Sequence, residues 1–405
     1  MEVKTRYKQT EVGIIPEDWD APRIDNVCKL INGRGFKPFE WKTTGLPIIR
    51  IQNLNGSDEF NYFDGSYDKK LEVDNGQLLF AWSGSRGTSF GPHIWRGSLG
   101  LLNYHTWKVQ SYDAVVSKEF LLHALRQLTW FIEGKAHGAA ALVHVQKWEM
   151  ESFRFPLPPT FVEQEAIAEA LSDADALIEA LDELIAKKRQ VKQGAMQELL
   201  SSKDNWIEKR LGNTAVLKAR IGWQGLTTKE YLDSGDYYLI TGTEFQDGYI
   251  DWSNCHYVNA SRYKQDKNIQ VREHDVLVTK DGTIGKVALI TDLPKPATLN
   301  SGVFVIRPIE DAFQPEFFYY LLCSKVFTEF LNQLSAGSTI NHLYQKDFVN
   351  FVYKTPATIE EQTAVAEILS DMDAEIAALE GKLTKARQVK QGMMSELLTG
   401  RVRLV

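Results

Sequence analysis

The chain has 405 residues, of which 43% are hydrophobic and 24% are charged, and its formal net charge is −7. This length is sufficient for two or three domains with cores of their own, and the composition is that of an ordinary globular protein. No run approaches the roughly 20 apolar residues of a transmembrane helix and the first residues lack the apolar core of a signal peptide, so we expect a cytoplasmic protein that does not engage a membrane.

The first half of the chain has the pattern of a mixed α/β domain. Short apolar runs predict strands at 47–51 and 78–82, and the second strand leads into a turn that contains Gly84 and Gly87. Residues 118–133 have a helical pattern, and a further glycine-containing loop follows at 138–144.

A long segment at the end of this half recurs at the end of the chain. Residues 163–200 and 361–398 align without gaps at an offset of 198, and 24 of their 38 positions are identical. Pro158 and Pro159 precede the first copy and Pro356 precedes the second. The chain therefore consists of two copies of a unit of about 200 residues, which is far longer than the period of a solenoid repeat.

Both copies are predicted to be helices of a coiled coil, because their apolar residues alternate at spacings of four and three. These residues are Ile167, Leu171, Ala174, Ile178, Leu181 and Ile185 in the first copy, and Val365, Leu369, Met372, Ile376, Leu379 and Leu383 in the second. In the first copy acidic residues occupy 163–183 and basic residues 187–192, and the second copy is similar. Two such helices can therefore pair antiparallel within one chain, acidic end against basic end. The alternative is a coiled coil between two chains. A helix of 38 residues is about 57 Å long.

The second half repeats the first only faintly. Residues 237–241 and 276–279 are predicted strands, residues 315–334 have a helical pattern, and 337–342 resemble the earlier loop in position. Residues 78–87 align with 276–285 at the offset of 198. Near-identical helices therefore flank two divergent domains, which indicates a constant scaffold that carries two different binding surfaces. We place the boundaries at 1–160, 161–203, 204–358 and 359–405.

The negative charge is concentrated in the two helices. Residues 163–200 hold 9 acidic and 4 basic residues and residues 361–398 hold 7 and 4, so the rest of the chain has a net charge of +1. A domain with little net charge can still bind phosphate if its basic residues cluster locally. The overall acidity therefore does not exclude a nucleic-acid partner.

Motifs for catalysis are missing from the sequence. It has neither the glycine-rich cofactor turn nor the aminomethylation motif of a methyltransferase, and the glutamate–x–lysine matches at 133–135 and 380–382 fall in predicted helices. Residues 281–286 lack the spacing of a phosphate-binding loop. Three widely spaced cysteines and no close histidine pair predict reduced thiols and no metal site. We therefore expect binding without catalysis.

Basic residues interleaved with aromatic ones and glycines occur at corresponding places in both halves, around 29–50 and 214–229. Arginine and lysine neutralise phosphates and, with polar side chains in the glycine-containing turns, can contact base edges. A solvated surface loop is the simpler explanation for either cluster alone. The candidate DNA-contacting residues are Arg34, Lys37, Lys42, Arg50, Asn53, Ser83, Ser85 and Arg86 in the first half, and Arg220, Trp223, Thr241, Lys280, Asp281, Thr283, Ser338, Thr339, Asn341 and His342 in the second.

The whole chain resembles the specificity subunits of Type I restriction–modification enzymes. The resemblance is carried by residues 11–19 (EVGIIPEDW), the twin strand–turn segments ending at Gly87 and Gly285, the turn AGSTIN at 336–341, and the RQVKQG segment near the end of each long helix. One departure concerns the first half, where residues 138–142 (GAAAL) replace the turn that contains serine and threonine in the second. A polar role at that turn therefore transfers to the second half only.

The resemblance implies two target-recognition domains, each reading one half of a split sequence in double-stranded DNA, separated by an antiparallel coiled coil. A helix of about 57 Å corresponds to about 17 base pairs of DNA, at roughly 3.4 Å each, which is more than one turn of the duplex. It also implies two methyltransferase subunits docked on the helices and two restriction subunits beyond them. S-adenosylmethionine, ATP and Mg²⁺ would belong to these partners, with no cofactor in this chain. The alternatives are a recognition subunit of another restriction class and a non-enzymatic protein–protein scaffold.

Overall fold

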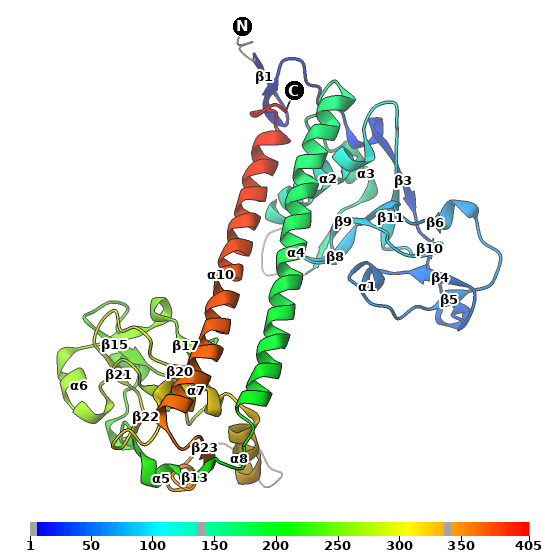
Figure 1. Ribbon diagram of the computed structural model, residues 1–405. Helices are drawn as coiled ribbons and strands as arrows, with labels where there is room; N and C mark the ends of the chain where they lie inside the picture. The colour runs from blue at the N-terminus through cyan, green and yellow to red at the C-terminus, as the bar shows by residue number, and fades with distance from the viewer. Residues whose placement is uncertain (1–5, 136–141, 336–341, 405) are drawn as a thin grey trace. The chain divides into compact units, whose positions relative to one another are not determined.

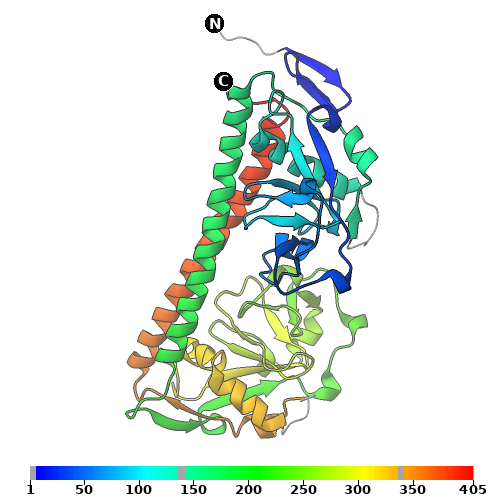
Figure 2. The same ribbon diagram turned by 90° about the vertical axis from the view of Figure 1, so that its right-hand side faces the viewer.

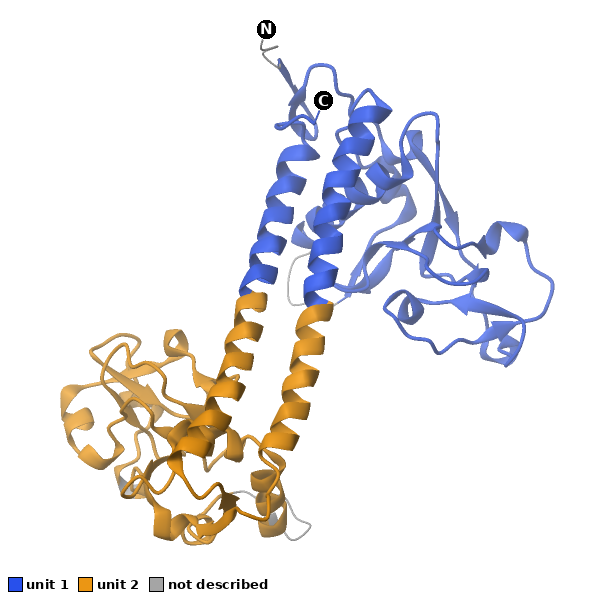
Figure 3. Ribbon diagram, viewed as in Figure 1, with its two compact units in different colours: residues 1–182, 381–405 blue, residues 183–380 orange. Residues whose placement is uncertain are grey.

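The computed structural model describes residues 6–135, 142–335 and 342–404. The chain divides into two compact units, residues 1–182 with 381–405 and residues 183–380 (Figure 3). Each unit contains one globular half together with one stretch of each long helix. Within the described ranges, none of the helices combines the length and the apolar character needed to cross a bilayer.

The first unit is built on two four-stranded sheets, with orders β3-β11-β7-β9 and β5-β4-β10-β6. The strands are β3 (Cys28–Asn32), β4 (Leu46–Ile49), β5 (Tyr62–Phe63), β6 (Glu72–Val73), β7 (Leu78–Ala81), β9 (Gly91–Ile94), β10 (Gly100–Leu102) and β11 (Thr106–Ser111). All pairs in these sheets are antiparallel except β4 with β10, which is parallel. The buried runs predicted at 47–51 and 78–82 are thus β4 and β7.

Smaller elements complete the first unit. They are the hairpin β1 (Tyr7–Thr10) and β2 (Gly13–Pro16), the pair β8 (Ser83–Ser85) and β12 (Leu142–His144), and the helices α1 (Ile51–Leu54), α2 (Lys118–Lys135) and α3 (Lys147–Ser152). Helix α2 confirms the helical pattern at 118–133. Its buried face, with Phe120, Leu121 and Leu125, joins a core that also contains Trp19 and Phe80.

The second unit repeats this arrangement, with sheet orders β14-β22-β19-β20 and β18-β15-β21. Its elements are β13 (Ile207–Arg210), α5 (Leu211–Thr214), β14 (Ala215–Ala219), β15 (Tyr237–Ile240), β16 (Phe245–Gln246), β17 (Tyr249–Ile250), β18 (His256–Val258), α6 (Ala260–Lys264), β19 (Val276–Thr279), β20 (Val287–Leu289), β21 (Ala297–Leu299), β22 (Val303–Pro308), α7 (Pro315–Leu322), α8 (Lys325–Ser335), α9 (Gln345–Phe348) and β23 (Val352–Thr355). Here β15 and β21 are the parallel pair. The equivalence of β4 with β15 and of β10 with β21 shows that the duplication extends through the divergent domains.

One element differs from the sequence expectation. The helical pattern at 315–334 is two helices, α7 and α8, interrupted at Cys323 and Ser324. The Ser324 hydroxyl accepts a hydrogen bond from the Val326 N–H at 3.3 Å, and therefore starts α8 as a capping residue. The apolar period continues across the break, which is why the sequence alone indicated one helix.

The two long helices are α4 (Phe161–Leu199) and α10 (Ile359–Leu397). They lie side by side in both views (Figures 1 and 2). The ion pairs between them are Asp175–Lys390 and Asp182–Arg387 in the first unit, and Lys188–Glu375, Arg189–Glu380 and Lys192–Asp373 in the second. Partners of the early residues of α4 lie late in α10, and partners of its later residues lie early. The predicted antiparallel pairing within one chain, acidic end against basic end, is therefore confirmed, as is the mixed α/β class.

Equivalent aspartates attach each globular half to its stretch of the helix pair. In the first unit Asp175 pairs with Lys390 and also with Arg126 of α2. In the second unit Asp373 pairs with Lys192 and accepts a hydrogen bond from the Tyr320 hydroxyl of α7 at 2.8 Å. The duplicated helices therefore supply the same aspartate–lysine bridge, and each domain adds its own third partner.

His123 of α2 lies where the first globular half packs against α4. Its side chain is buried, with the ring Nε2 atom 3.0 Å from the Ser172 hydroxyl of α4. Burial, and then the neighbouring Arg126 charge, lower the pKa of this imidazole from 6.5 to about 4. Because the folded-state pKa is depressed, the stability that neutral His123 contributes is present above pH 6.5 and is lost as the pH falls from there towards 4.

We expect this residue alone to reduce the free energy of unfolding by about 2 kcal/mol between pH 7 and pH 5. Thermal unfolding at the two pH values would measure it, with His123→Gln losing most of this pH dependence and His144→Gln, at an exposed strand position, retaining it. Equal pH dependence of the parent chain and the His123 variant would contradict the assignment.

Candidate nucleic-acid interface

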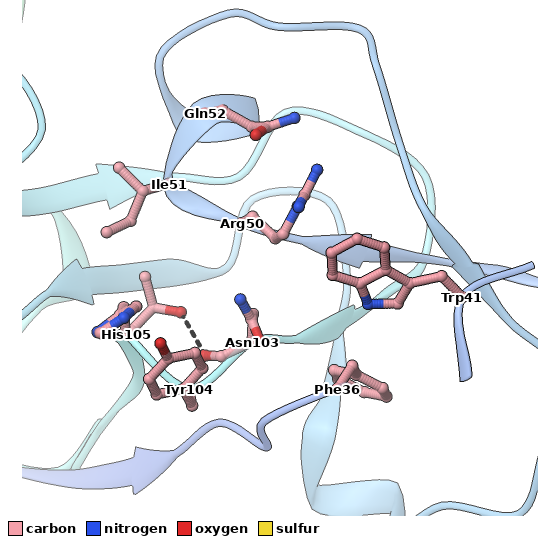
Figure 4. Close-up of a pocket in the computed structure, with 9 residues that line it drawn as sticks. Phe36, Trp41, Arg50, Ile51, Gln52, Asn103, Tyr104 and His105 are labelled. Atoms are coloured by element: carbon pink, nitrogen blue, oxygen red, sulfur yellow. Dashed lines mark hydrogen bonds between the residues drawn. The ribbon is translucent and has the colours of Figure 1, made fainter. Parts of the chain in front are cut away.

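In the first unit the ends of three strands meet at one edge. Since β4 and β10 are parallel, their carboxyl ends lie together, and the Asn103 N–H donates to the Ile49 carbonyl at 3.2 Å. The Arg34 N–H, just after β3, donates to the Leu102 carbonyl at 3.0 Å. A pocket of about 350 Å³ opens at this edge (Figure 4). It is lined by Phe36, Trp41, Arg50, Ile51, Gln52, Asn103, Tyr104, His105 and Thr106.

Arg50 is held in this pocket by contacts on two sides. Its backbone N–H donates to the Asn53 side chain at 3.0 Å, so Asn53, which is buried, caps the short helix α1. Its guanidinium lies over the Trp41 ring, 5.3 Å from the ring centroid. The Nε atom of Arg50 is buried and has no hydrogen-bond partner among the described residues.

The floor of the pocket is aromatic and neutral. The rings of Tyr104 and His105 lie 3.7 Å apart between centroids, and the backbone and indole N–H groups of Trp82 donate to the carbonyls of His105 and Tyr104. Burial lowers the pKa of His105 below its ordinary value, so the ring is neutral at neutral pH. These contacts bring the end of β7 to the same edge as the ends of β4 and β10.

The other residues predicted for the first half divide between this edge and the turns beside it. The Arg34 guanidinium lies over both the Phe36 and the Phe63 ring, which contact each other edge to face. It also pairs with Glu40, whose pKa is lowered by the Lys37 N–H and by Arg34. The side chains of Lys37 and Lys42 are exposed. Ser83 and Ser85 begin and end β8, and Arg86 lies exposed in the turn after it.

The equivalent edge of the second unit carries different side chains. Thr241 follows β15 where Arg50 follows β4, and its N–H donates to Glu244 at 2.9 Å as that of Arg50 does to Asn53. Asn300 follows β21 where Asn103 follows β10, and its N–H donates to the Ile240 carbonyl at 2.8 Å. The backbone of the two edges is therefore the same, the side chains differ where Arg50 is replaced by Thr241, and an asparagine follows the second strand in both.

A second group of predicted residues lies next to this edge. The Lys280 N–H donates to the Gly302 carbonyl at 2.8 Å, and the Leu343 N–H donates to the Lys280 carbonyl at 2.9 Å. The His342 ring pairs with the Asp281 carboxylate. Thr283 is exposed in the same turn, which Gly285 completes with a φ of +82° that favours glycine. Lys280, Asp281, Thr283 and His342 thus lie close together.

Two predicted residues near β14 have different surroundings. The Arg220 side chain is 1% exposed and binds the Leu299 carbonyl, Thr298 and Gln265, so its guanidinium is used inside the domain. Trp223 lies in a short 3₁₀ turn at 222–224, and its side chain lies outside what the structure describes. Ser338, Thr339 and Asn341 lie outside the described residues.

Sequence reasoning missed Gln52, Asn103, Tyr104 and His105 of the pocket. One signal was available. Leu102-Asn103 and Leu299-Asn300 recur at an offset of 197, one residue away from the offset of the helices. Allowing one gap in the comparison of the halves would have shown that an asparagine follows equivalent strands.

A family profile described as "Type I restriction modification DNA specificity domain" matches the chain twice, over residues 16–189 and 204–388. The chain belongs to this family. Each match contains one globular half and much of the long helix that follows it. The resemblance stated from the repeat and the shared segments is confirmed.

Relatives in the specificity-domain family extend over nearly the whole chain. The MjaVIII specificity subunit of Methanocaldococcus jannaschii is 25% identical, over 96% of this chain and 94% of its own length. The EcoBI specificity subunit of Escherichia coli is 24% identical, over 92% of this chain and 83% of its own length. The crystal structure of the S subunit from M. genitalium matches with a TM-score of 0.61 at 16% identity, covering 94% of this chain and 96% of that one, which shows a shared fold.

Proposed function

We propose that this chain is the DNA-specificity subunit of a Type I restriction–modification enzyme, and that its two domains each read one half of a split target in double-stranded DNA. The observation that carries the proposal is the contrast within the duplication. The helices are near-identical and the strand orders correspond, apart from β6, which has no counterpart among the strands described in the second unit, whereas the equivalent strand ends carry Arg50 in one unit and Thr241 in the other. A repeated scaffold with different side chains at its edges suits a protein that reads two different sequences.

The residues named at these edges supply both kinds of contact that sequence reading needs. Exposed Lys37 and Lys42 can neutralise phosphates, which positions a domain on the duplex without selecting a sequence. Arg50, Gln52 and Asn103 offer donors and acceptors that match base edges in the major groove. The paired helices are proposed to act as the spacer between half-sites and as the docking surface for two methyltransferase subunits.

Catalysis is assigned to those partners. Methyl transfer from S-adenosylmethionine would be carried out by the methyltransferase subunits, and ATP-dependent cleavage with Mg²⁺ by restriction subunits where these are present. The role of this chain is to select the DNA sequence and to position the partners on it, without a cofactor of its own.

Purification of the tagged full chain from its native cells, followed by mass measurement of the intact complex, tests the proposal. We expect two methyltransferase subunits per chain, and methylome sequencing of the same cells should give a two-part motif that is lost when the gene is deleted. A complex that contains no methyltransferase, or a methylome unchanged by the deletion, would contradict the proposal.

A further inference from the structure

The pocket at the edge of the first unit contains two buried polar atoms that lack partners. The Nε atom of Arg50 and the Nδ1 atom of His105 are both buried, and neither has a hydrogen-bond partner among the described residues. Both residues line the same pocket (Figure 4). Most buried polar groups in folded proteins are paired, so two exceptions at one pocket show that the described part of the protein does not itself satisfy the polar groups of this edge.

The lining of the pocket defines the chemistry of a ligand that fits it. Its polar side chains are the Arg50 guanidinium, the amides of Gln52 and Asn103, the ring of neutral His105, the hydroxyls of Tyr104 and Thr106 and the indole of Trp41, and no carboxylate is among the residues that line it. The Gln52 amide N–H also donates to the Glu59 carbonyl at 3.2 Å, which leaves its oxygen as an acceptor. The Trp41 ring beside the guanidinium limits the orientations that Arg50 can adopt. Such a site suits a planar ligand with hydrogen-bond acceptors on its edge.

The second unit shows that the fold does not require these open groups. At the position of Arg50 the Thr241 hydroxyl is hydrogen bonded to Glu244 at 2.9 Å. At the position of Asn103 the Asn300 amide binds the Leu226 N–H at 3.1 Å and the Tyr231 hydroxyl at 2.7 Å. The same backbone edge thus holds a threonine paired inside the domain in the second unit, and an arginine whose Nε atom has no partner among the described residues in the first.

We infer that this pocket reads base edges in one half-site, with Arg50 donating to the N7 and O6 acceptors of a guanine and the Gln52 and Asn103 amides contacting the adjacent base pair. The inference rests on the proposed function and adds the residues and the base that determine specificity. Bidentate pairing with guanine is the specific contact that arginine makes most often in the major groove, and Trp41 provides the fixed geometry that such a contact needs.

The test uses the complete complex with its methyltransferase subunits, and a DNA library in which every position of both half-sites is randomised. Arg50→Ala and Arg50→Lys should each reduce the preference for guanine at one position by roughly tenfold to a hundredfold. Gln52→Ala should weaken selection at the neighbouring position, and because Gln52 is exposed this variant keeps the test informative if Arg50→Ala does not fold. Preferences in the other half-site should stay unchanged.

Arg96→Ala is the matched control, because Arg96 is exposed and precedes β10, at the opposite end of the strand from Asn103. It should leave every preference unchanged. A uniform loss of affinity for all sequences in Arg50→Ala would show a phosphate contact and overturn the inference, as would unchanged preferences in both the Arg50 and the Gln52 variants. An unsubstituted complex that selects no sequence would instead overturn the proposed function, and the inference with it.

Discussion

Replacement of Arg403 by alanine should destabilise the first unit by about 3 kcal/mol, because it leaves a buried carboxylate without its partner. Arg403 pairs with Glu163 at the start of α4 and with Asp18, the latter at 3.0 and 3.1 Å, and its guanidinium lies over the Trp19 ring. The Glu163 side chain is 1% exposed. The arginine therefore joins the C-terminal tail to the segment around Asp18 and to the start of α4.

Differential scanning calorimetry of the full chain would measure this effect. At the size of this unit, about 3 kcal/mol corresponds to a lowering of Tm by roughly 10 °C in the transition of the first unit. Arg401→Ala is the matched control, because Arg401 is also an arginine of the tail but pairs with Glu396 at 3.5 Å, with both side chains largely exposed. That pair should contribute less than about 1 kcal/mol. Equal Tm values for the two variants would contradict the importance of the buried pair.

The long helices could be predicted from the sequence because their signal is local. A spacing of four and three is visible within any few turns, and the observed helices begin at Phe161 and Ile359, two residues before the repeated segments. The antiparallel pairing followed from the order of acidic and basic residues in each copy. The buried strands β4 and β7 were likewise visible as apolar runs.

Strand β10 could not be predicted in the same way. It has three residues, Gly100–Leu102, and its parallel partner β4 lies about 50 residues earlier in the chain. Neither its length nor its neighbours in the sequence distinguish it from a loop. Because β10 positions Asn103, Tyr104 and His105, the pocket that it helps to form was also missed.

The candidate site illustrates the difference between charge and orientation. Arg50 and Arg220 both lie in basic segments, yet one lines a pocket and the other is buried against the Leu299 carbonyl. Which of these occurs depends on contacts with residues far away in the sequence, such as Thr298 and Gln265 for Arg220. Composition predicts that a segment is basic, but tertiary packing decides which of its side chains can reach a ligand.

Exchange of residues 214–355 for the equivalent segment of another member of the family should change one half of the DNA target completely and leave the other half unchanged. This prediction rests on the proposed function and on the contacts of the second unit. Thr214 and Tyr353, whose hydroxyl groups lie 2.9 Å apart, move together in the exchange. On the long helices, the exchanged segment packs against residues that include Met196 and Leu369. Both residues lie in the repeated helical segments, which stay in place in the exchange.

Methylome sequencing of cells that carry the exchanged chain would read both half-sites at once. Replacing the equivalent segment of the first half should change only the half-site that the first domain reads. Each chimaera is therefore the control for the other. Methylation at the original two-part site should fall to background in both. If one exchange altered both half-sites, the two units would not read DNA independently, and the differences between Arg50 and Thr241 at their equivalent edges would need another explanation.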